Sequence, residues 1–420
     1  MRTTRERKSV LNQAKACRGE PTSCGIFRRT VEVSSDGQHL DLVLLADARY
    51  ASLSFRPNVT PIASVLDSFR DANLSNPFMD AFVGLGGVEN PEALRVVMNQ
   101  FPGDVFAAGQ LAAAELQGAF NGLLPTYQNG YGNYVTPMAD TFRGQTCRPK
   151  NYRNEYWASP TGRWVERGAQ SGYYGYDLAN FGIAFGVSRK INSRNHIGIA
   201  FGYDCAKLDM NSISQKDEMN SLHVATYGGY VDSGRFFDWH LGYGKNFHET
   251  DRRIVVGSFL GNPHAKYDDN ILSAGMMYGR RFGAFLPSVG VEFVQIWTPA
   301  FSESGGNGSD LRGLKSDYIS LEVPVGFRLR NTYKNFLTPE FRTFWVPQLC
   351  DDRSGVGTAF VAGGSEFVVE TGDLGWQHGR IGGGLNARLS SCVDASLNYD
   401  ASIYSGHTRQ TASGTITVRF

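Results

Sequence analysis

The 420-residue sequence lacks several features that would place it in a common protein class. It has no excess of one charge, since 41 lysines and arginines stand against 40 aspartates and glutamates, and this balance argues against nucleic acid as a partner. No stretch reaches the roughly 18 apolar residues that a transmembrane helix needs. The opening residues, MRTTRERKSVLNQAKACRGE, are basic without an apolar core, so as written they do not form a secretory signal peptide.

Cysteine is sparse, and catalytic motifs are missing. The six cysteines form no CxxC pair and no Cys/His ligand spacing, so isolated thiols are expected, with Cys17–Cys24 the only local pair that could close a loop. The sequence contains neither HExxH nor GxSxG, and GLGG at Gly84–Gly87 lacks the strand and helix of a phosphate-binding loop. We therefore expect no enzyme active site, no metal site and no cofactor.

Glycine and aromatic residues are abundant instead, with 49 Gly, 27 Phe, 19 Tyr and 6 Trp. From about residue 154 to the end, apolar and small or polar residues alternate with the period of two that is typical of β-strands. Twelve such segments are predicted, over residues 154–165, 173–189, 195–208, 218–232, 235–248, 266–281, 284–301, 312–330, 335–347, 376–390, 392–404 and 408–420. Short and long connections alternate between them, as expected when the two rims of a barrel face different compartments.

The first third of the chain has a different texture. Residues 30–55 alternate as short strands, whereas helix formers with three- and four-residue apolar spacing dominate residues 56–145. One predicted helix covers 136–144, with Thr136 and Pro137 at its start and Gly144 at its end. Another covers 103–121.

Alternation alone does not decide between a membrane barrel and a soluble β-sandwich, since both have one apolar face. The second face of these strands mixes Gly, Ala and Ser with charged residues, a composition that suits a wet barrel interior better than a solvated exterior. Aromatic residues near the strand ends would form the interfacial girdles of a membrane barrel. The polar residues predicted to face the lumen are Asp238, His240, Glu292, Glu322, Arg328, Glu340, Arg342, Arg388, Asp394 and Asp400. They either contact a helix in the pore or supply general interior polarity.

The last strand, SGTITVRF, places Ile416, Val418 and Phe420 on one face and ends on Phe420. Together with GYYGYDLANFGIAFGVSRKI, GRFFDWHLGYGKN, LPSVGVEFVQIWTPAFSESG and LTPEFRTFWVPQL, in this order, it resembles the translocator barrel of type V secretion autotransporters. The resemblance implies a twelve-stranded outer-membrane barrel with an N-terminal helix through its pore. It also implies that the barrel-assembly machinery reads the terminal strand through Ile416, Val418 and Phe420.

The predicted fold class is thus an all-β transmembrane barrel of about twelve antiparallel strands, preceded by a helical linker and a short β-helix-like remnant. Residues 1–55 are assigned to the end of a passenger, 56–145 to the linker and 146–420 to the barrel. For the helix in the pore, 136–144 is preferred because it lies closest to the first strand, and 103–121 is the second choice.

The expected function is to anchor the chain in the outer membrane of a Gram-negative bacterium and to translocate its own N-terminal passenger to the cell surface. The alternatives are a plugged outer-membrane channel or surface adhesin without active secretion, and a soluble all-β binding module. The expected partners are outer-membrane lipid, the barrel-assembly machinery and the chain's own passenger segment, with the barrel itself a monomer.

Overall fold

A computed structural model describes residues 27–33, 40–46, 50–52, 55–71, 91–124, 153–331, 333, 336–350, 353–390 and 392–419. The chain divides into two compact units. The first comprises residues 1–101 with 255–260, and the second comprises residues 102–254 with 261–420.

The N-terminal unit combines a hairpin with short helices. Strand β1 (Phe27–Val33) pairs antiparallel with β2 (Leu40–Ala46), in the region where the sequence predicted short strands. The 3-10 helix η1 (Tyr50–Ser52) and the helices α2 (Val59–Asp71) and α4 (Pro91–Met98) follow. The Asp67 carboxylate of α2 accepts hydrogen bonds from the backbone N–H groups of Tyr50 (2.9 Å) and Ala51 (3.0 Å), which fixes η1 against the helix.

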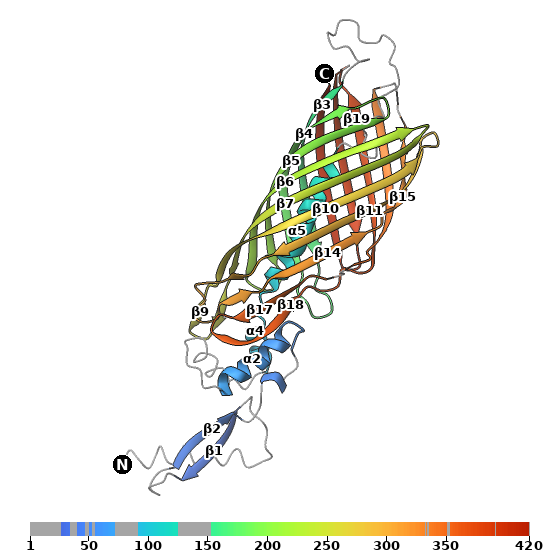
Figure 1. The fold of residues 1–420 in the computed structure, drawn as a ribbon. Coiled ribbons are helices and arrows are strands. Elements are labelled where there is room, and N and C mark those ends of the chain that lie inside the picture. Colours follow the sequence, from blue (N-terminus) through green and yellow to red (C-terminus); the bar gives the residue numbers. More distant parts are fainter. Residues whose placement is uncertain are drawn as a thin grey trace. The chain divides into compact units, whose positions relative to one another are not determined.

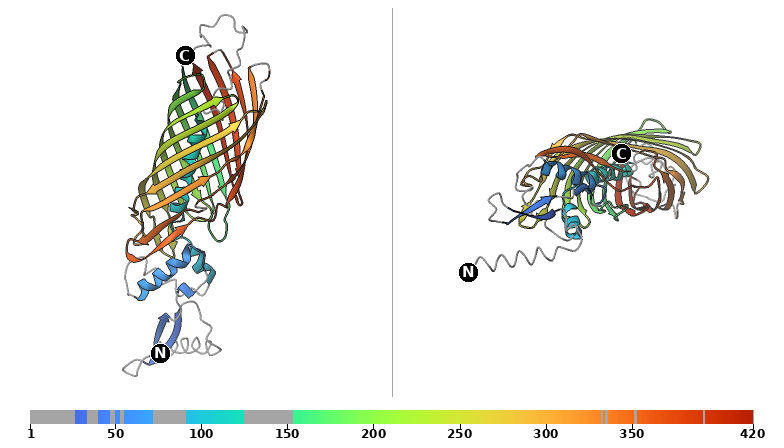
Figure 2. Two further views of the ribbon diagram at one scale, coloured as in Figure 1. Left: turned by 45° about the vertical axis from the view of Figure 1, so that its right-hand side comes forward. Right: turned by 90° about the horizontal axis from the view of Figure 1, so that it is seen from below.

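The second unit is a closed antiparallel barrel with one helix inside it (Figures 1 and 2). Every strand predicted from the two-residue period is present. The barrel strands are β3 (Asn154–Arg167), β4 (Tyr176–Lys190), β5 (Asn195–Met210), β6 (Gln215–Asp232), β7 (Arg235–Arg252), β10 (His264–Arg280), β11 (Phe285–Thr298), β14 (Ser316–Glu322), β15 (Val325–Arg330), β16 (Leu337–Pro347), β19 (Gln377–Arg388), β20 (Val393–Ile403) and β21 (His407–Arg419).

Two of these elements are halves of one strand. Both β14 and β15 pair with β11, and they are separated at Val323 and Pro324, because proline has no N–H to donate to the ladder. The predicted segment 312–330 is therefore interrupted, and the barrel has twelve strands. The last strand, β21, pairs with the first, β3, with Val418 opposite Tyr156 and Ile416 opposite Ala158. This pairing closes the sheet and removes its edges, as a structure surrounded by lipid requires.

The apolar side chains point outward. Along β5 the exposed and buried positions alternate over the whole strand, and Ile197, Ile199, Phe201 and Tyr203 form the exposed row. On β4 the outward Phe181 keeps 62% of its surface accessible. A soluble sandwich would bury these rows, so the apolar-out prediction is confirmed. No helix in the described part of the chain is long and apolar enough to cross a membrane.

The two rims differ. At one rim, where β21 ends, the strands are joined through residues 191–194, 233–234, 281–284, 331–336 and 389–392, and we call it the short-turn rim. The other, the long-loop rim, carries the connections 253–263, 299–315 and 348–376. These contain β8 (Ile254–Val256), β9 (Phe259–Gly261) and a four-stranded sheet of β12 (Phe301–Ser302), β13 (Leu311–Gly313), β17 (Gly355–Phe360) and β18 (Gly363–Glu370).

Helix α5 (Asp104–Leu123) runs along the inside of the barrel (Figures 1 and 2). It packs against β4, β5, β6, β7, β10 and β11, with β17 and β18 near its N-terminal end. The segment found in the lumen is therefore the second choice of the sequence analysis. The preferred segment, 136–144, lies outside the described residues, and its assignment stays a prediction.

The cysteines follow the sequence expectation only in part. Cys205 and Cys350 are free and exposed, as expected of isolated thiols. Cys392, however, takes part in a disulfide bond, so the expectation of isolated thiols was wrong for this residue. Neither its position just before β20 nor its spacing from other cysteines indicated this bond. The suggested Cys17–Cys24 pair lies outside the described residues.

Candidate functional site: the barrel lumen and its helix

The composition of α5 explains how it fits inside the barrel. Its sequence, DVFAAGQLAAAELQGAFNGL, is rich in Ala and Gly, so the helix is narrow and buried on nearly every side. No side chain of the helix caps its N-terminus. Instead, Gln215 of β6 accepts a hydrogen bond from the Val105 N–H (3.1 Å) and donates one to the Pro102 carbonyl (2.6 Å). The barrel wall thus satisfies helix-end groups that would otherwise be unpaired.

Two glutamines seven residues apart fix the helix along its length. The Gln117 Oε1 atom accepts a hydrogen bond from the ring nitrogen Nδ1 of His223 (2.9 Å), and the Gln117 amide nitrogen donates to the Ser273 hydroxyl (3.0 Å). Gln110 donates to the Thr298 hydroxyl (3.1 Å) and accepts from the Ser354 hydroxyl (2.6 Å). Because these amides are buried, each bond lost would leave a polar group without a partner.

Glu115 provides the one carboxylate that α5 places in the middle of the lumen. Its Oε2 atom lies 2.8 Å from Arg163 Nη1 on β3 and 3.0 Å from Arg409 Nη1 on β21. Arg163 Nε also donates to the Thr411 hydroxyl on β21 at 3.0 Å. The helix therefore connects the first and last strands of the barrel from the inside.

A close approach at Gly109 defines the fit near the long-loop rim. A Cβ atom added to Gly109 would lie 2.7 Å from Asp217 Oδ2. That carboxylate cannot easily move, because it is fully buried and lies 2.7 Å from His248 Nδ1. His248 Nε2 lies 3.0 Å from Asp269, and the imidazole stacks on Tyr267 with ring centroids 4.5 Å apart. Only glycine lets the helix backbone approach this network so closely.

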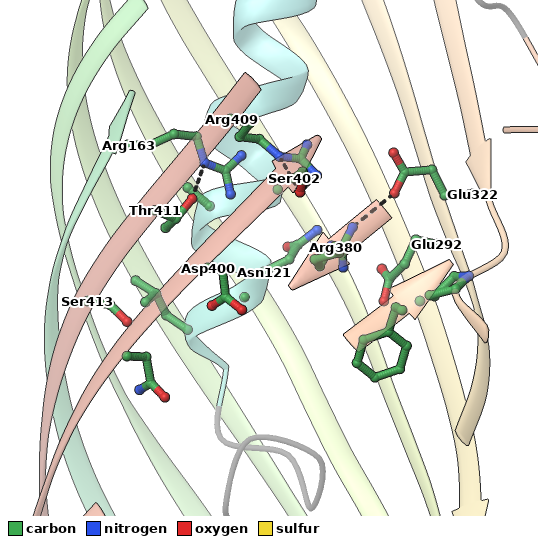
Figure 3. A pocket seen from close by; sticks show the side chains of 18 of the residues that line it. Asn121, Arg163, Glu292, Glu322, Arg380, Asp400, Ser402, Arg409, Thr411 and Ser413 are labelled. Carbon is green, nitrogen blue, oxygen red and sulfur yellow. Dashed lines mark hydrogen bonds and ion pairs between the residues drawn. The ribbon is translucent and has the colours of Figure 1, made fainter. Parts of the chain in front are cut away.

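Beside the helix the lumen retains a cavity of about 310 Å³. It lies between the small face of α5, including Ala114, Gly118 and Gly122, and charged side chains of the wall. Figure 3 shows Arg163 and Arg409 near the helix, and Arg380 joined to Glu322 farther along the wall, at 3.2 Å. In the part of the chain that is described, no group of three or more His, Cys, Asp or Glu side chains could hold a metal ion.

The structure places the predicted lumen residues inside the barrel and pairs most of them. Glu340 binds Arg328 (2.8 Å), Arg330 and Arg342 (3.0 Å), and Arg342 also binds Asp400. His240 lies 3.5 Å from Glu292, and Arg388 lies 3.6 Å from Asp394. Nine of the ten line the cavity: Asp238, His240, Glu292, Glu322, Arg328, Glu340, Arg342, Asp394 and Asp400.

The three polar side chains that α5 directs at the wall, Gln110, Glu115 and Gln117, bind residues other than these ten. Instead, the contacts with the helix come from residues that the sequence analysis did not single out, among them Arg163, His223 and Arg409. Their inward positions follow from strand parity, but nothing in the sequence marks which inward residues meet the helix. The helix side had a usable signal, since Gln110, Glu115 and Gln117 are the polar residues of an Ala-rich segment.

The remaining site predictions concern the chain end and the other helix. Ile416 lies on the outer face of β21 and Val418 is half-buried beside it. Phe420 and the helix-cap residues Thr136, Pro137 and Gly144 lie outside the described residues. The role of these six residues stays a prediction.

A family model described as the autotransporter beta-domain matches residues 156–400. Among solved structures, the barrel is similar to the translocator domain of autotransporter NalP from Neisseria meningitidis, with a TM-score of 0.56 and 11% identity over 76% of this chain and 99% of that one. The barrel is also similar to the beta domain of the Bordetella autotransporter BrkA, with a TM-score of 0.44 and 17% identity over 64% of this chain and 100% of that one. For the transport unit of the autotransporter AIDA-I from Escherichia coli, the TM-score is 0.44 and the identity 12%, over 69% of this chain and 96% of that one. No curated protein matches the sequence significantly.

Proposed function

The chain belongs to the autotransporter beta-domain family and forms an outer-membrane β-barrel translocator domain, and we propose that it carries its own N-terminal segment to the cell surface. In this proposal the barrel anchors the chain in the bacterial outer membrane, and α5 holds the end of the exported segment in the lumen. The chain itself has no catalytic role.

One observation carries the proposal, namely the course of α5 through the lumen. The helix begins at the long-loop rim, where Gln215 binds Pro102 and Val105, and its Phe120 stacks on His223 deeper inside, with ring centroids 5.1 Å apart. The lumen helix is therefore joined to the preceding chain at Pro102, at the long-loop rim. If this rim faces the outside, as its long connections favour, the preceding segment is delivered to the surface.

The test places an epitope tag before Met1 behind a working signal peptide and exposes intact cells to protease. Digestion of the tag with the barrel still protected in the outer membrane is the expected result. A barrel that inserts while its tag stays inaccessible would contradict the proposal. That second outcome would favour a plugged channel, with the cavity of about 310 Å³ beside α5 as the open space in its lumen.

A further inference from the structure

A row of arginines follows the short-turn rim from β3 to β11. Backbone hydrogen bonds link neighbouring turns there: the Val231 N–H donates to the Arg194 carbonyl (2.9 Å) and the Arg281 N–H donates to the Gly234 carbonyl (2.7 Å), so the row is continuous. The exposed members, which we call the basic arc, are Arg153, Arg189, Arg194, Arg235, Arg280 and Arg281. Only Arg194 has an acidic partner among the described residues, Asp232 at 3.4 Å and half-exposed.

The basic arc continues the rows of lipid-facing side chains at the short-turn ends of the strands. On β4 the outward row that contains Phe181, Ile183 and Phe185 ends at Arg189, and on β10 the row that contains Met276 and Tyr278 ends at Arg280. Apolar side chains also stand at the turns. Ile191 keeps 65% of its surface exposed, and Phe282 keeps 54% exposed while Arg280 lies over its ring at 5.0 Å. Arginines next to exposed apolar side chains are suited to the level of lipid headgroups.

Arg235 and Arg280 are directly opposite each other in the register of β7 and β10. Like charges at such a position destabilise a sheet, and neither side chain has a carboxylate within ion-pair distance among the described residues. The opposite rim is arranged differently. There the register sets Lys207 opposite Glu218 (3.1 Å) and Lys216 opposite Asp251 (3.0 Å). These lysines of the long-loop rim are thus paired with carboxylates, whereas among the described residues Arg235 and Arg280 of the short-turn rim are not.

We propose that the basic arc binds the phosphate groups of anionic glycerophospholipids in the membrane leaflet at the short-turn rim. A phosphodiester between Arg235 and Arg280 would offset their repulsion, and guanidinium groups bind phosphate with two parallel hydrogen bonds. Lipid is the occupant because the arc continues the lipid-facing rows, where the acyl chains of such a molecule would lie.

The experiment uses the purified full chain in a neutral detergent, mixed with equal amounts of phosphatidylglycerol and phosphatidylcholine, and counts retained lipids by native mass spectrometry. We expect wild-type protein to retain more phosphatidylglycerol than phosphatidylcholine. In the double variant Arg235→Gln/Arg280→Gln, the ratio of the two retained lipids should fall by between about tenfold and thirtyfold. The range follows because each basic residue near an anionic surface contributes on the order of 1 kcal/mol, and about 1.4 kcal/mol corresponds to tenfold.

The matched control is Lys216→Gln/Lys266→Gln, which removes the same charge from the long-loop rim and should leave the preference unchanged. Mobility of the unboiled protein on gels verifies that each variant is folded, and a titration of the phosphatidylglycerol fraction tests the wild type without any substitution. Equal retention of both lipids, or an equal loss in both double variants, would overturn the proposal. So would displacement by millimolar glycerol phosphate, which indicates a site for a free anion, or binding of an acidic periplasmic protein without lipid preference.

Discussion

Arg163 and Arg409 belong to the two strands that close the barrel, and both bind the same carboxylate, that of Glu115 in the lumen helix. Their strands are neighbours in register, with Arg409 opposite Val165 and Thr411 opposite Arg163. The ion pairs therefore tie the helix to both sides of the closing seam. This arrangement makes the seam and the helix mutually dependent.

Replacing Glu115 with Gln should weaken both the closing seam between β3 and β21 and the attachment of α5 to the barrel wall. The substitution leaves the buried Arg163 and the largely buried Arg409 without their carboxylate, and removing one partner of a buried ion pair costs on the order of 3 kcal/mol. We expect a lower unfolding temperature in the heat-dependent gel shift and a larger ion conductance in planar bilayers, because the helix is held less firmly. The matched control is Glu218→Gln, which breaks the exposed pair with Lys207 and should cost less than about 1 kcal/mol. Equal effects of the two substitutions would contradict a special role of Glu115.

Gly109→Ala tests the close approach of the helix to the barrel wall. The added methyl group would lie 2.7 Å from Asp217 Oδ2, which His248 holds in place, so the helix must shift. We expect a loss of about 1–3 kcal/mol, as for other overpacked sites. Gly122→Ala is the control, because its Cβ would meet nothing within 4 Å and alanine favours a helix by about 1 kcal/mol. Thermal unfolding of both variants in the same detergent gives the comparison, and a stabilised Gly109→Ala protein would contradict the fit described here.

Leu397→Lys and Ser413→Lys test which face of the sheet meets lipid. Leu397 is exposed on the outer face of β20, whereas Ser413 of β21 lines the cavity, at the register position opposite Asn398 (Figure 3). A lysine on the lipid face near the bilayer centre destabilises a barrel by about 2–4 kcal/mol. We expect Leu397→Lys to reduce the amount of folded barrel in the outer membrane and Ser413→Lys to leave it nearly unchanged. The reverse order would mean that the two faces are assigned incorrectly.

The fold could be predicted because its signal is local and repeated. Alternation such as that of Phe181, Ile183 and Phe185 requires no knowledge of the neighbouring strands, and the charged residues between the apolar ones indicated a wet interior. The break at Pro324 was also visible in principle, since proline cannot donate to the ladder.

The contacts of the helix could not be predicted in the same way. Gln117 and His223 are 106 residues apart, and Glu115 and Arg409 are 294 apart, so each contact depends on how far the helix enters the barrel and how it is rotated. The preference for 136–144 rested on closeness to the first strand in sequence. The position of α5 in the lumen depends on the steric fit at Gly109 and on buried polar partners, which closeness in sequence does not reveal.

Two free cysteines among the described residues provide a test of orientation that needs no added label site. Cys350 is exposed just after β16, in the connection 348–376 of the long-loop rim, whereas Cys205 is exposed on the outer face of β5 within the lipid-facing row. A maleimide too large for porins reaches only thiols in water outside the cell. If the long-loop rim faces outward, intact cells that export the chain behind a signal peptide should label Cys350, as located by peptide mapping. Cys350→Ser should abolish that label and Cys205→Ser should not. Labelling of Cys350 only after the outer membrane is permeabilised would place the long-loop rim in the periplasm and contradict surface delivery through this barrel.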